Sequence, residues 1–380
     1  MSENLSPLAW IAVSRAALKH NIAALRELLG TGPSDLRLIA VVKANGFGHG
    51  AAETARIFQE TGADFFAVTT PNEAVELRET GIEGRILVFL PPLPEQIALM
   101  RAYDLDMTLC DEEALVSLVS APNAPGRPLR VHLKVDTGMG RLGILPEGAL
   151  ALAQRIASEP NIQMAGIYTH FAHALDKDAG KTQAQFARFQ KVLAELERQG
   201  IDPGLRHCAN SAATLRFPEM RLDAVRPGTI LYGQYPSAAV PRLLDLQETW
   251  RMQGRVVSVR QVPAGTAVGY GGEFVTRRAS CLAVLPIGYA DGFTVAPASA
   301  TAGWRGVKTL IKDLAGRGPK LSVTLRGRRA PIVGRVAMQI CTVDVTDCPD
   351  VAIGDIATVP ARRITAGARL PRLYLDQFED

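Results

Sequence analysis

The segment that decides the fold, residues 36–50, reads LRLIAVVKANGFGHG. The apolar run from Leu36 to Val42 predicts a buried strand of about seven residues. The glycines that follow end this strand and let the backbone approach a ligand. A lysine at a buried strand end, here Lys43, is unfavourable unless its amine reacts or is paired, because burial lowers its pKa. A lowered pKa suits an amine that forms an imine. A lysine that reaches solvent along a strand edge would show the same pattern.

Composition narrows the class of protein. A chain of 380 residues is long for a single core and favours two domains. The net charge of +4 comes from basic residues scattered among acids, so a nucleic-acid surface is not indicated and small anionic ligands fit better. Five cysteines without CxxC spacing suggest neither a disulfide framework nor a zinc site. We see no signal peptide and no apolar run of about 18 residues, so we expect a cytoplasmic protein without a membrane partner.

Residues 14–234 read as strands that alternate with helices. The alternation predicts a parallel (β/α)8 barrel, although a doubly wound sheet would give the same pattern. Polar residues at the carboxyl ends of the strands favour the barrel, since barrel enzymes place their chemistry there. These residues are Lys43, Asp136, His170, Asn210 and Arg226. The predicted strands are 36–43, 64–69, 85–90, 105–109, 130–136, 163–170, 205–210 and 222–226.

Residues 235–380 have a different texture. Short alternating segments bounded by glycine and proline replace the helical periodicity, which predicts a mostly antiparallel β domain. We expect the strand within residues 1–13 to join it. The stretch from Ala298 to Gly318 reads as a long loop or an insertion.

The segment VHLKVDTGMGRLG, residues 131–143, has a polar face. Period two places His132, Lys134 and Asp136 on one side of a strand, so these side chains point into a site or pair within the barrel. The glycine-rich turn that follows presents Arg141, whose planar fork suits a carboxylate or a phenolate oxygen. An ordinary polar strand and turn remains the alternative.

Two further strand ends suggest a phosphate site. The segment HCANSAAT places Ser211 at the start of a helix, where a hydroxyl and backbone N–H groups can hold a phosphate. The segment VRPGTI brings Gly228 and Thr229 after the eighth strand, and the loops after strands seven and eight are the usual phosphate site of such barrels. A serine that caps a helix is common, so each segment alone is weak.

Together these segments resemble the bacterial alanine racemases, which use pyridoxal 5'-phosphate. The likeness extends over nearly the whole chain and includes AVGYGG at 267–272, LPIGYADG at 285–292 and PIVGRVAM at 331–338. It implies that Lys43 holds the cofactor as a Schiff base and that His170 lies against the cofactor ring. It also implies that Arg226, supported by His207, faces the pyridine nitrogen and leaves it unprotonated.

The resemblance assigns further roles. Arg141 would approach the cofactor and the substrate carboxylate, Lys134 would be carbamylated to orient Arg141, and Met338 would bind the carboxylate through its backbone N–H. Racemisation requires a base on each face of a planar intermediate. Lys43 and Tyr270 would be these two bases, and Tyr270 would come from the partner subunit of a homodimer. The implied activity is interconversion of L- and D-alanine, which supplies D-alanine for peptidoglycan.

Some positions depart from the family pattern. Phe47 replaces a tyrosine that reaches the phosphate, Gln339 stands where an aspartate is usual, and the acid in His173-Ala174-Leu175-Asp176 is displaced by one position. The C-terminal stretch after Val359 looks shortened, and Tyr374 is not a convincing substitute for the usual tyrosine. Loss of the phosphate contacts predicts weaker cofactor binding.

Three rival functions remain open. A broad-specificity amino-acid racemase would share this architecture. A decarboxylase of the same architecture would set an acid against the pyridine nitrogen, which Arg226 argues against. A non-catalytic carrier of pyridoxal phosphate would lack the β domain.

Overall fold

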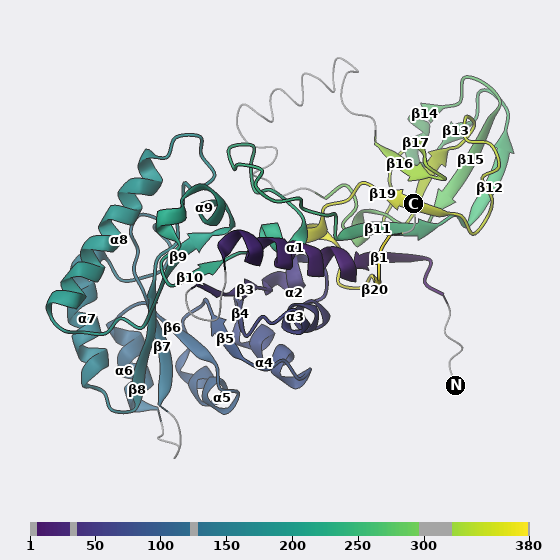
Figure 1. Ribbon diagram of the computed structural model, residues 1–380. Coiled ribbons are helices and arrows are strands. Elements are labelled where there is room, and N and C mark those ends of the chain that lie inside the picture. Colours follow the sequence, from purple (N-terminus) through teal and green to yellow (C-terminus); the bar gives the residue numbers. More distant parts are fainter. Residues whose placement is uncertain (1–5, 31–35, 122–127, 296–320, 379–380) are drawn as a thin grey trace. The chain divides into compact units, whose positions relative to one another are not determined.

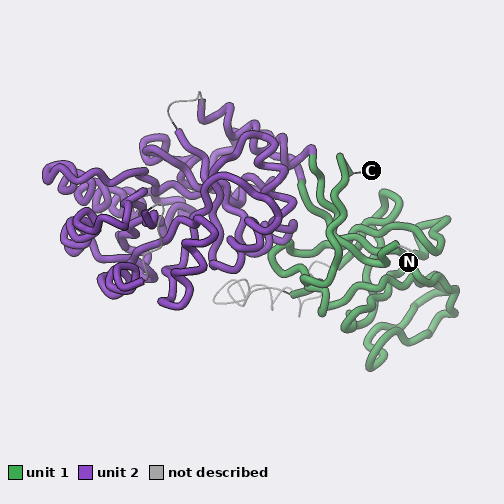
Figure 2. The backbone as a smooth tube through the Cα atoms, turned by 90° about the horizontal axis from the view of Figure 1, so that it is seen from below, with its two compact units in different colours: residues 1–15, 249–380 green, residues 16–248 purple. Residues whose placement is uncertain are grey.

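The computed structural model describes residues 6–30, 36–121, 128–295 and 321–378. The predicted loop from Ala298 to Gly318 lies outside these residues. The chain divides into two compact units, one of residues 16–248 and one of residues 1–15 with 249–380 (Figure 2).

The unit of residues 16–248 is a closed parallel barrel (Figure 1). Its sheet has the order β2-β10-β9-β8-β7-β6-β5-β4-β3, and β2 (Arg37–Leu38) and β3 (Ala40–Val41) are two halves of one extended stretch. Ile39, between these halves, donates its N–H to Val225 O at 2.9 Å. The first and last strands in the order therefore join, which confirms the (β/α)8 barrel and excludes an open doubly wound sheet. The other strands are β4 (Phe65–Val68), β5 (Arg85–Val88), β6 (Asp106–Leu109), β7 (Leu129–Lys134), β8 (Ile162–Tyr168), β9 (Leu205–Asn210) and β10 (Ala224–Arg226).

Helices alternate with the strands and surround the barrel (Figure 1). Each buries an apolar stripe; α8, for example, buries Phe186, Phe189 and Leu196. Three of the described helices begin with a side-chain cap. Thr70 accepts from the Glu73 N–H, Asp111 accepts from the Ala114 N–H, and Asn210 caps α9. The helices are α1 (Arg15–Leu29), α3 (Ala51–Glu60), α4 (Pro71–Glu79), α5 (Ile97–Ala102), α6 (Glu112–Ser120), α7 (Pro146–Ser158), α8 (Gly180–Arg198) and α9 (Ser211–Arg216).

The barrel unit extends to residue 248, beyond the boundary at 234 that the sequence suggests. Two side chains of α1 hold the extra segment: His20 Nε2 lies 2.8 Å from Asp245 O, and Asn21 Nδ2 donates to Gln247 O at 3.0 Å. These contacts are made to backbone oxygens, so they leave no signal in the identity of residues 245 and 247.

The other unit is built on one large sheet, antiparallel except at one edge. Its order is β12-β15-β18-β17-β16-β19-β11-β1-β20, and β1 (Ala9–Ser14) pairs antiparallel with β11 and parallel with β20. The antiparallel β domain is thus confirmed. Residues 250–262 form two strands, and β20 was not expected from the sequence. The strands are β11 (Trp250–Arg255), β12 (Ser258–Val262), β15 (Ser280–Leu285), β16 (Ser322–Leu325), β17 (Arg328–Val333), β18 (Cys341–Asp344), β19 (Ile356–Val359) and β20 (Arg372–Leu375), with a separate hairpin of β13 (Ala267–Val268) and β14 (Phe274–Val275).

Candidate active site

A pocket of about 360 Å³ lies where the barrel strands end. Its walls come from the segments after β3, β5, β8, β9 and β10. The pocket brings together six residues that the sequence predicts as site residues: Lys43, His170, Ser211, Arg226, Gly228 and Thr229.

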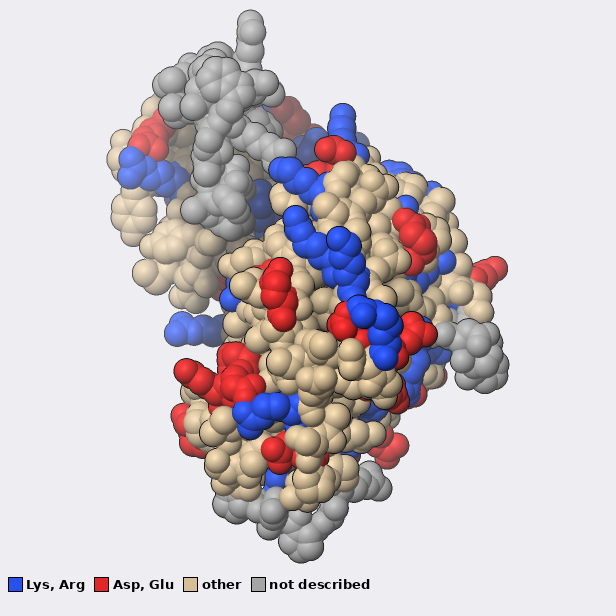
Figure 3. Space-filling model, turned by 90° about the vertical axis from the view of Figure 1, so that its left-hand side faces the viewer, with Lys and Arg blue, Asp and Glu red and all other residues tan. Residues whose placement is uncertain are grey.

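Among the described residues, none of the helices is both long and apolar enough to cross a membrane. Basic and acidic side chains are interspersed on the face shown in Figure 3.

The turn that follows Lys43 is left-handed. The strand ends at Val41, two residues before Lys43, so the expected strand is too long at this end. Ala44, Asn45, Gly46 and Phe47 all have φ between 52° and 61°. One of the four is glycine and one is asparagine, which tolerates this conformation, but Ala44 and Phe47 each cost roughly 1–2 kcal/mol there. Strain of this kind persists only where surrounding contacts impose it.

A carboxylate from the next βα unit imposes this turn. Glu73 Oε1 accepts the Ala44 N–H at 2.7 Å, while Glu73 Oε2 accepts from the backbone of Thr69 and Thr70 at 2.8 and 3.0 Å. Asn45 Oδ1 accepts the Ala51 N–H at 2.9 Å, which ties the turn to the start of α3. Glu73 was not predicted as a site residue. The Thr70-x-x-Glu73 capping box was readable, but its bond to Ala44 was not.

The Lys43 amine is partly buried at the pocket. Burial lowers its pKa from the ordinary value, the charge of Arg141 lowers it further, and Glu73 opposes both. The amine lies 6.0 Å from the centre of the Phe89 ring. The described contacts include no hydrogen bond to this amine. Burial without an acceptor favours the neutral, nucleophilic form.

Lys134 is a second amine in the barrel and is 5% exposed. Burial lowers its pKa to about 8; Cys110 and Asp136 oppose this, and Arg226 and Arg141 add to it. The amine lies 5.3 Å from the centre of the Tyr168 ring. Within the described part of the chain it has no hydrogen-bond partner, so a fraction of it is neutral at neutral pH.

The polar side chains of β7 and of the residues just after it make two different kinds of contact. His132 is fully buried and pairs within the barrel, whereas the Asp136 carboxylate turns to the glycine-rich loop that follows. Burial would raise the pKa of Asp136, but N–H donors of the loop, at 2.7 to 2.9 Å for residues 138–140, lower it. This carboxylate anchors the loop that carries Arg141, which is exposed.

Arg226 is buried and surrounded by acceptors. Its Nη1 donates to His207 Nδ1 at 2.6 Å and to His207 O at 2.9 Å, and its Nη2 donates to Thr169 O at 2.7 Å. The expected support of Arg226 by His207 is thereby confirmed. Burial and the charge of Arg226 lower the pKa of His170 to about 3, so this pocket residue is neutral.

The loops after β9 and β10 are joined by one hydrogen bond. The Gly228 N–H donates to Ser211 Oγ at 2.9 Å, and none of the described residues accepts the Ser211 hydroxyl proton. A Cβ at position 228 would lie 2.8 Å from the tip of the Phe47 ring, so any larger residue there would displace that ring. The sequence suggested that the first N–H groups of α9 are open to a phosphate. The Asn210 side chain instead accepts those of Ala212 and Ala213, both at 3.1 Å.

Tyr270 and Met338 lie in the other unit, on loops that contact each other. Tyr270 is 74% exposed and follows Gly269, whose φ is 76°. Met338 is exposed and accepts the Ala290 N–H through its backbone oxygen at 2.9 Å. An ion pair between Glu273 and Arg335 joins the two loops.

Two family descriptions match the chain. "Alanine racemase, N-terminal domain" matches residues 13–236, and "Alanine racemase, C-terminal domain" matches residues 249–368. These two ranges include all of the predicted site residues.

Individual proteins are similar over most of their length. An alanine racemase from Methanococcus maripaludis is 40% identical over 92% of this chain and 88% of its own. One from Desulfovibrio desulfuricans is 36% identical over 97% and 98%. Among solved structures, the alanine racemase of Streptomyces lavendulae, a D-cycloserine producer, has a TM-score of 0.81 at 33% identity and 99% coverage of both chains. That of Clostridium difficile 630 has a TM-score of 0.87 at 26% identity, over 98% of this chain and 97% of that one.

Proposed function

The chain belongs to the alanine racemase family and is an isomerase, and we propose that it interconverts L- and D-alanine with pyridoxal 5'-phosphate and two bases. The observation that carries the proposal is the pocket itself. It joins a lysine of lowered pKa to a buried arginine, a neutral histidine and a hydroxyl whose proton none of the described residues accepts. An aldehyde, a pyridine ring and a phosphate need groups of this kind.

The pocket residues fit the cofactor in three places. Lys43 would bond to the aldehyde carbon, since its lowered pKa favours the neutral amine. Ser211 would donate its hydroxyl to the phosphate while it accepts from Gly228, and Thr229 would complete this end of the site. His170, which is neutral, would lie against the ring. When bound, the cofactor withdraws electrons from the substrate and acidifies its α-hydrogen.

Arg226 limits how strongly electrons are withdrawn. An arginine only donates hydrogen bonds and does not give up a proton at neutral pH. Facing the pyridine nitrogen, Arg226 would therefore leave that nitrogen unprotonated. The bound cofactor would then be a weaker electron acceptor, which would favour return of the proton to the α-carbon.

Lys43 and Tyr270 would move the proton on opposite faces of the substrate. Lys43 would act as the base toward D-alanine and Tyr270 as the base toward L-alanine. Tyr270 would reach the pocket of a second copy in a homodimer. Its exposure in this chain supports that role, since a side chain that completes a partner's site is not buried in its own fold.

The substrate carboxylate would be held by Arg141 and by the backbone N–H of Met338. The pKa of about 8 gives Lys134 the neutral fraction that reacts with CO₂, with loss of an N–H proton, to form a carbamate. A carbamate there would be an anionic acceptor for Arg141. The reaction would supply D-alanine for peptidoglycan in the cytoplasm.

Chiral analysis of alanine tests the proposal. Purified protein with pyridoxal phosphate should convert L-alanine to a near-equal mixture of enantiomers. The Tyr270→Phe variant should lose about 10²- to 10⁴-fold of the L-to-D rate and still bind the cofactor. Tyr103→Phe, which removes a phenol bonded to Glu79, is the matched control and should retain the rate. Failure to racemise alanine, or full activity of Tyr270→Phe, would refute the two-base reaction.

The same assay distinguishes a second candidate. Each of the other L-amino acids is incubated under the same conditions. Comparable rates with several of them would show a broad-specificity amino-acid racemase of the same fold.

A further inference from the structure

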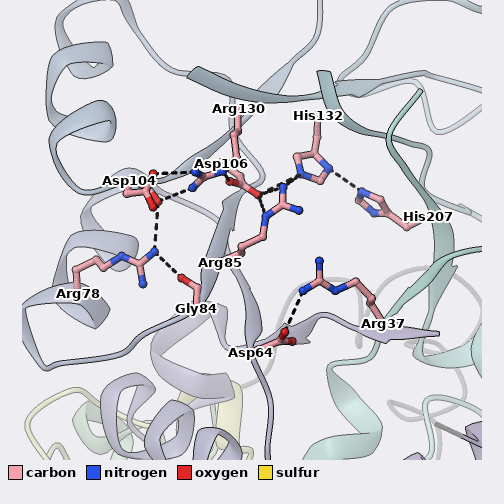
Figure 4. Close-up of polar contacts among 10 residues, drawn as sticks. All are labelled: Arg37, Asp64, Arg78, Gly84, Arg85, Asp104, Asp106, Arg130, His132 and His207. Carbon is pink, nitrogen blue, oxygen red and sulfur yellow. Dashed lines mark hydrogen bonds and ion pairs between the residues drawn. The ribbon is translucent and has the colours of Figure 1, made fainter. Parts of the chain in front are cut away.

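A line of buried polar side chains leads from Arg226 through the barrel to Asp106. Figure 4 shows the part of this line from His207 through His132 to Asp106. Arg226 Nη1 lies 2.6 Å from His207 Nδ1, and His207 Nε2 lies 2.9 Å from His132 Nδ1. His132 Nε2 lies 3.3 Å from Asp106 Oδ2. The four residues come from β10, β9, β7 and β6 and are at most 3% exposed.

The two ends of this line fix the protons between them. Arg226 only donates, so His207 Nδ1 must be the acceptor. A neutral His207 then carries its proton on Nε2 and donates to His132 Nδ1. His132 in turn carries its proton on Nε2 and donates to Asp106. Burial lowers the pKa of both histidines, which agrees with two neutral rings.

Arg85 provides a check on this order. Its Nη2 lies 3.3 Å from His132 Nε2, so it could donate there instead. The proton of His132 would then lie on Nδ1 and that of His207 on Nδ1, facing a donor of Arg226. That order is excluded by repulsion, and Arg85 Nη2 has Asp106 Oδ2 as an acceptor at 2.5 Å.

Asp106 is held as a carboxylate. Burial would raise its pKa, but the hydrogen bond from His132 and the charges of Arg85 and Arg130 lower it. Arg130 Nε donates to the second oxygen, Oδ1, at 2.5 Å. Both oxygens thus accept strong donors, and the fully buried carboxylate remains charged.

The fold leaves space for the central hydrogen bond. β8 lies between β7 and β9, and a Cβ at Gly166 would come within 2.5 Å of His132 Nδ1. The Tyr168 ring stacks on His207 with centroids 4.9 Å apart and an angle of 7° between planes. The Tyr168 hydroxyl is 2.9 Å from Thr108 Oγ1, which fixes that ring in turn.

We propose that Asp106 is a positioning residue for Arg226, acting as its remote counter-charge through His132 and His207. Among the described residues, no carboxylate contacts Arg226. The hydrogen-bonded line that starts at Arg226 ends at the carboxylate of Asp106. The relay aligns the guanidinium and stabilises its charge. That the aligned guanidinium faces the cofactor rests on the proposed function.

Nuclear magnetic resonance of the cofactor-free protein tests the relay directly. With ¹⁵N-labelled histidine, wild-type His207 and His132 should both show a protonated Nε2 and a bare Nδ1 at neutral pH. A proton on Nδ1 of either ring, or a doubly protonated ring, would overturn the proposal. This measurement needs no racemase activity, so its outcome is independent of the proposed function.

Two variants and a matched control complete the test. Asp106→Asn removes the charge, and His132→Phe interrupts the line while leaving Asp106 with Arg85 and Arg130. In both, the Nε2 proton of His207 should shift upfield and exchange faster with water. Asp104→Asn breaks the Arg130–Asp104 pair in the same cluster without touching His132, and should leave His207 unchanged. The proposal falls if Asp106→Asn leaves this proton unchanged, or if Asp104→Asn moves it equally.

The loaded enzyme supplies a separate measurement. Misalignment of Arg226 should lower kcat for alanine about tenfold in Asp106→Asn and His132→Phe, with KM within about threefold of wild type. The absorption band of the bound cofactor should also move in both variants. A rise in KM at constant kcat would contradict a positioning role.

Discussion

The basic side chains in and around the pocket fall into two groups, which differ in the groups that surround each charge. On one side, Arg226 is buried among acceptors that its N–H groups reach at 2.6 to 2.9 Å. On the other, the Lys43 amine is partly buried at the pocket and the Lys134 amine is buried in the barrel, and the described residues place no hydrogen-bond acceptor on either. Burial lowers the pKa in all three cases. Only the arginine, with its high intrinsic pKa, stays charged regardless.

The comparison shows how one barrel can hold a fixed cation and a reactive amine close together. Acceptors and a remote carboxylate stabilise the guanidinium where a charge is required. Absence of acceptors destabilises the ammonium where a nucleophile is required. For the arginine, both the residue type and its hydrogen bonds favour the charged form. For the lysines, the residue type and the lack of acceptors both permit the neutral form. A substitution in one group should therefore leave the charge state of the other unchanged.

The largest effect is expected for Lys43→Ala, which removes the reactive amine. The variant should lose the visible absorption band of the lysine-bonded cofactor and about a thousandfold or more of alanine racemisation. Lys191→Ala, an exposed lysine on α8, should retain both. Absorption spectroscopy and chiral analysis check this prediction. A Lys43→Ala protein that still shows the band would remove Lys43 from its assigned role.

Arg226→Lys tests the charged side. A lysine cannot reach His207 and Thr169 O together, so buried acceptors lose their donors. We expect the free energy of unfolding to fall by about 3 kcal/mol. Arg206→Lys, at the more exposed pair with Asp223, should change it by about 1 kcal/mol or less. Urea unfolding measures the loss in the free energy of unfolding for both variants. Equal losses would mean that the buried contacts of Arg226 stabilise the fold no more than the exposed pair does.

The sequence predicts much of this arrangement and misses the parts that depend on distant contacts. The eight barrel strands were readable because short strand-like segments alternate regularly with helical patterns. The left-handed turn was not readable, since Ala44 and Phe47 do not favour positive φ and the Ala44 N–H is held by Glu73, which is distant in the sequence. Strand β20 was missed because it is defined by pairing with β1, at the opposite end of the chain.

At the site too, local sequence predicts some features, whereas others depend on contacts between distant segments. Strand-end positions predicted which residues line the pocket, and six of them meet there. The connection of His132 to His207 could not be predicted, because it crosses β8 where Gly166 leaves room. Asp106 begins its strand rather than ending it, so the rule that points to strand ends overlooks it.

Lys134→Met tests the amine side through stability. The pKa of Lys134 is about 8 in the folded protein and 10.5 ordinarily, so the folded state binds fewer protons between these values. Wild-type stability should therefore rise with pH across that window. Below it, the variant should be more stable by about 1 kcal/mol, because a buried unpaired charge is removed.

The gain of Lys134→Met should shrink as the pH approaches 10.5. Unfolding is followed in CO₂-depleted buffer so that a carbamate does not form. Lys191→Met, at an exposed position, should show no such pH dependence. A gain that is constant from neutral to alkaline pH would mean that the folded and unfolded states bind the Lys134 proton equally, so that burial does not lower the pKa of this amine.

The smallest effect is expected at the phosphate end, for Phe47→Tyr. The Phe47 ring lines the pocket beside Gly228 and lies 4.7 Å from the Tyr232 ring, so a phenol here would extend toward the Ser211 and Thr229 end. One added hydrogen bond to a charged acceptor should lower the Kd of pyridoxal phosphate about threefold to tenfold. Phe89→Tyr adds the same hydroxyl on the Lys43 side of the pocket and should leave the Kd unchanged. If the two variants bind equally, the phosphate does not lie between Phe47 and Ser211, and the assignment of Ser211, Gly228 and Thr229 to the phosphate loses its support.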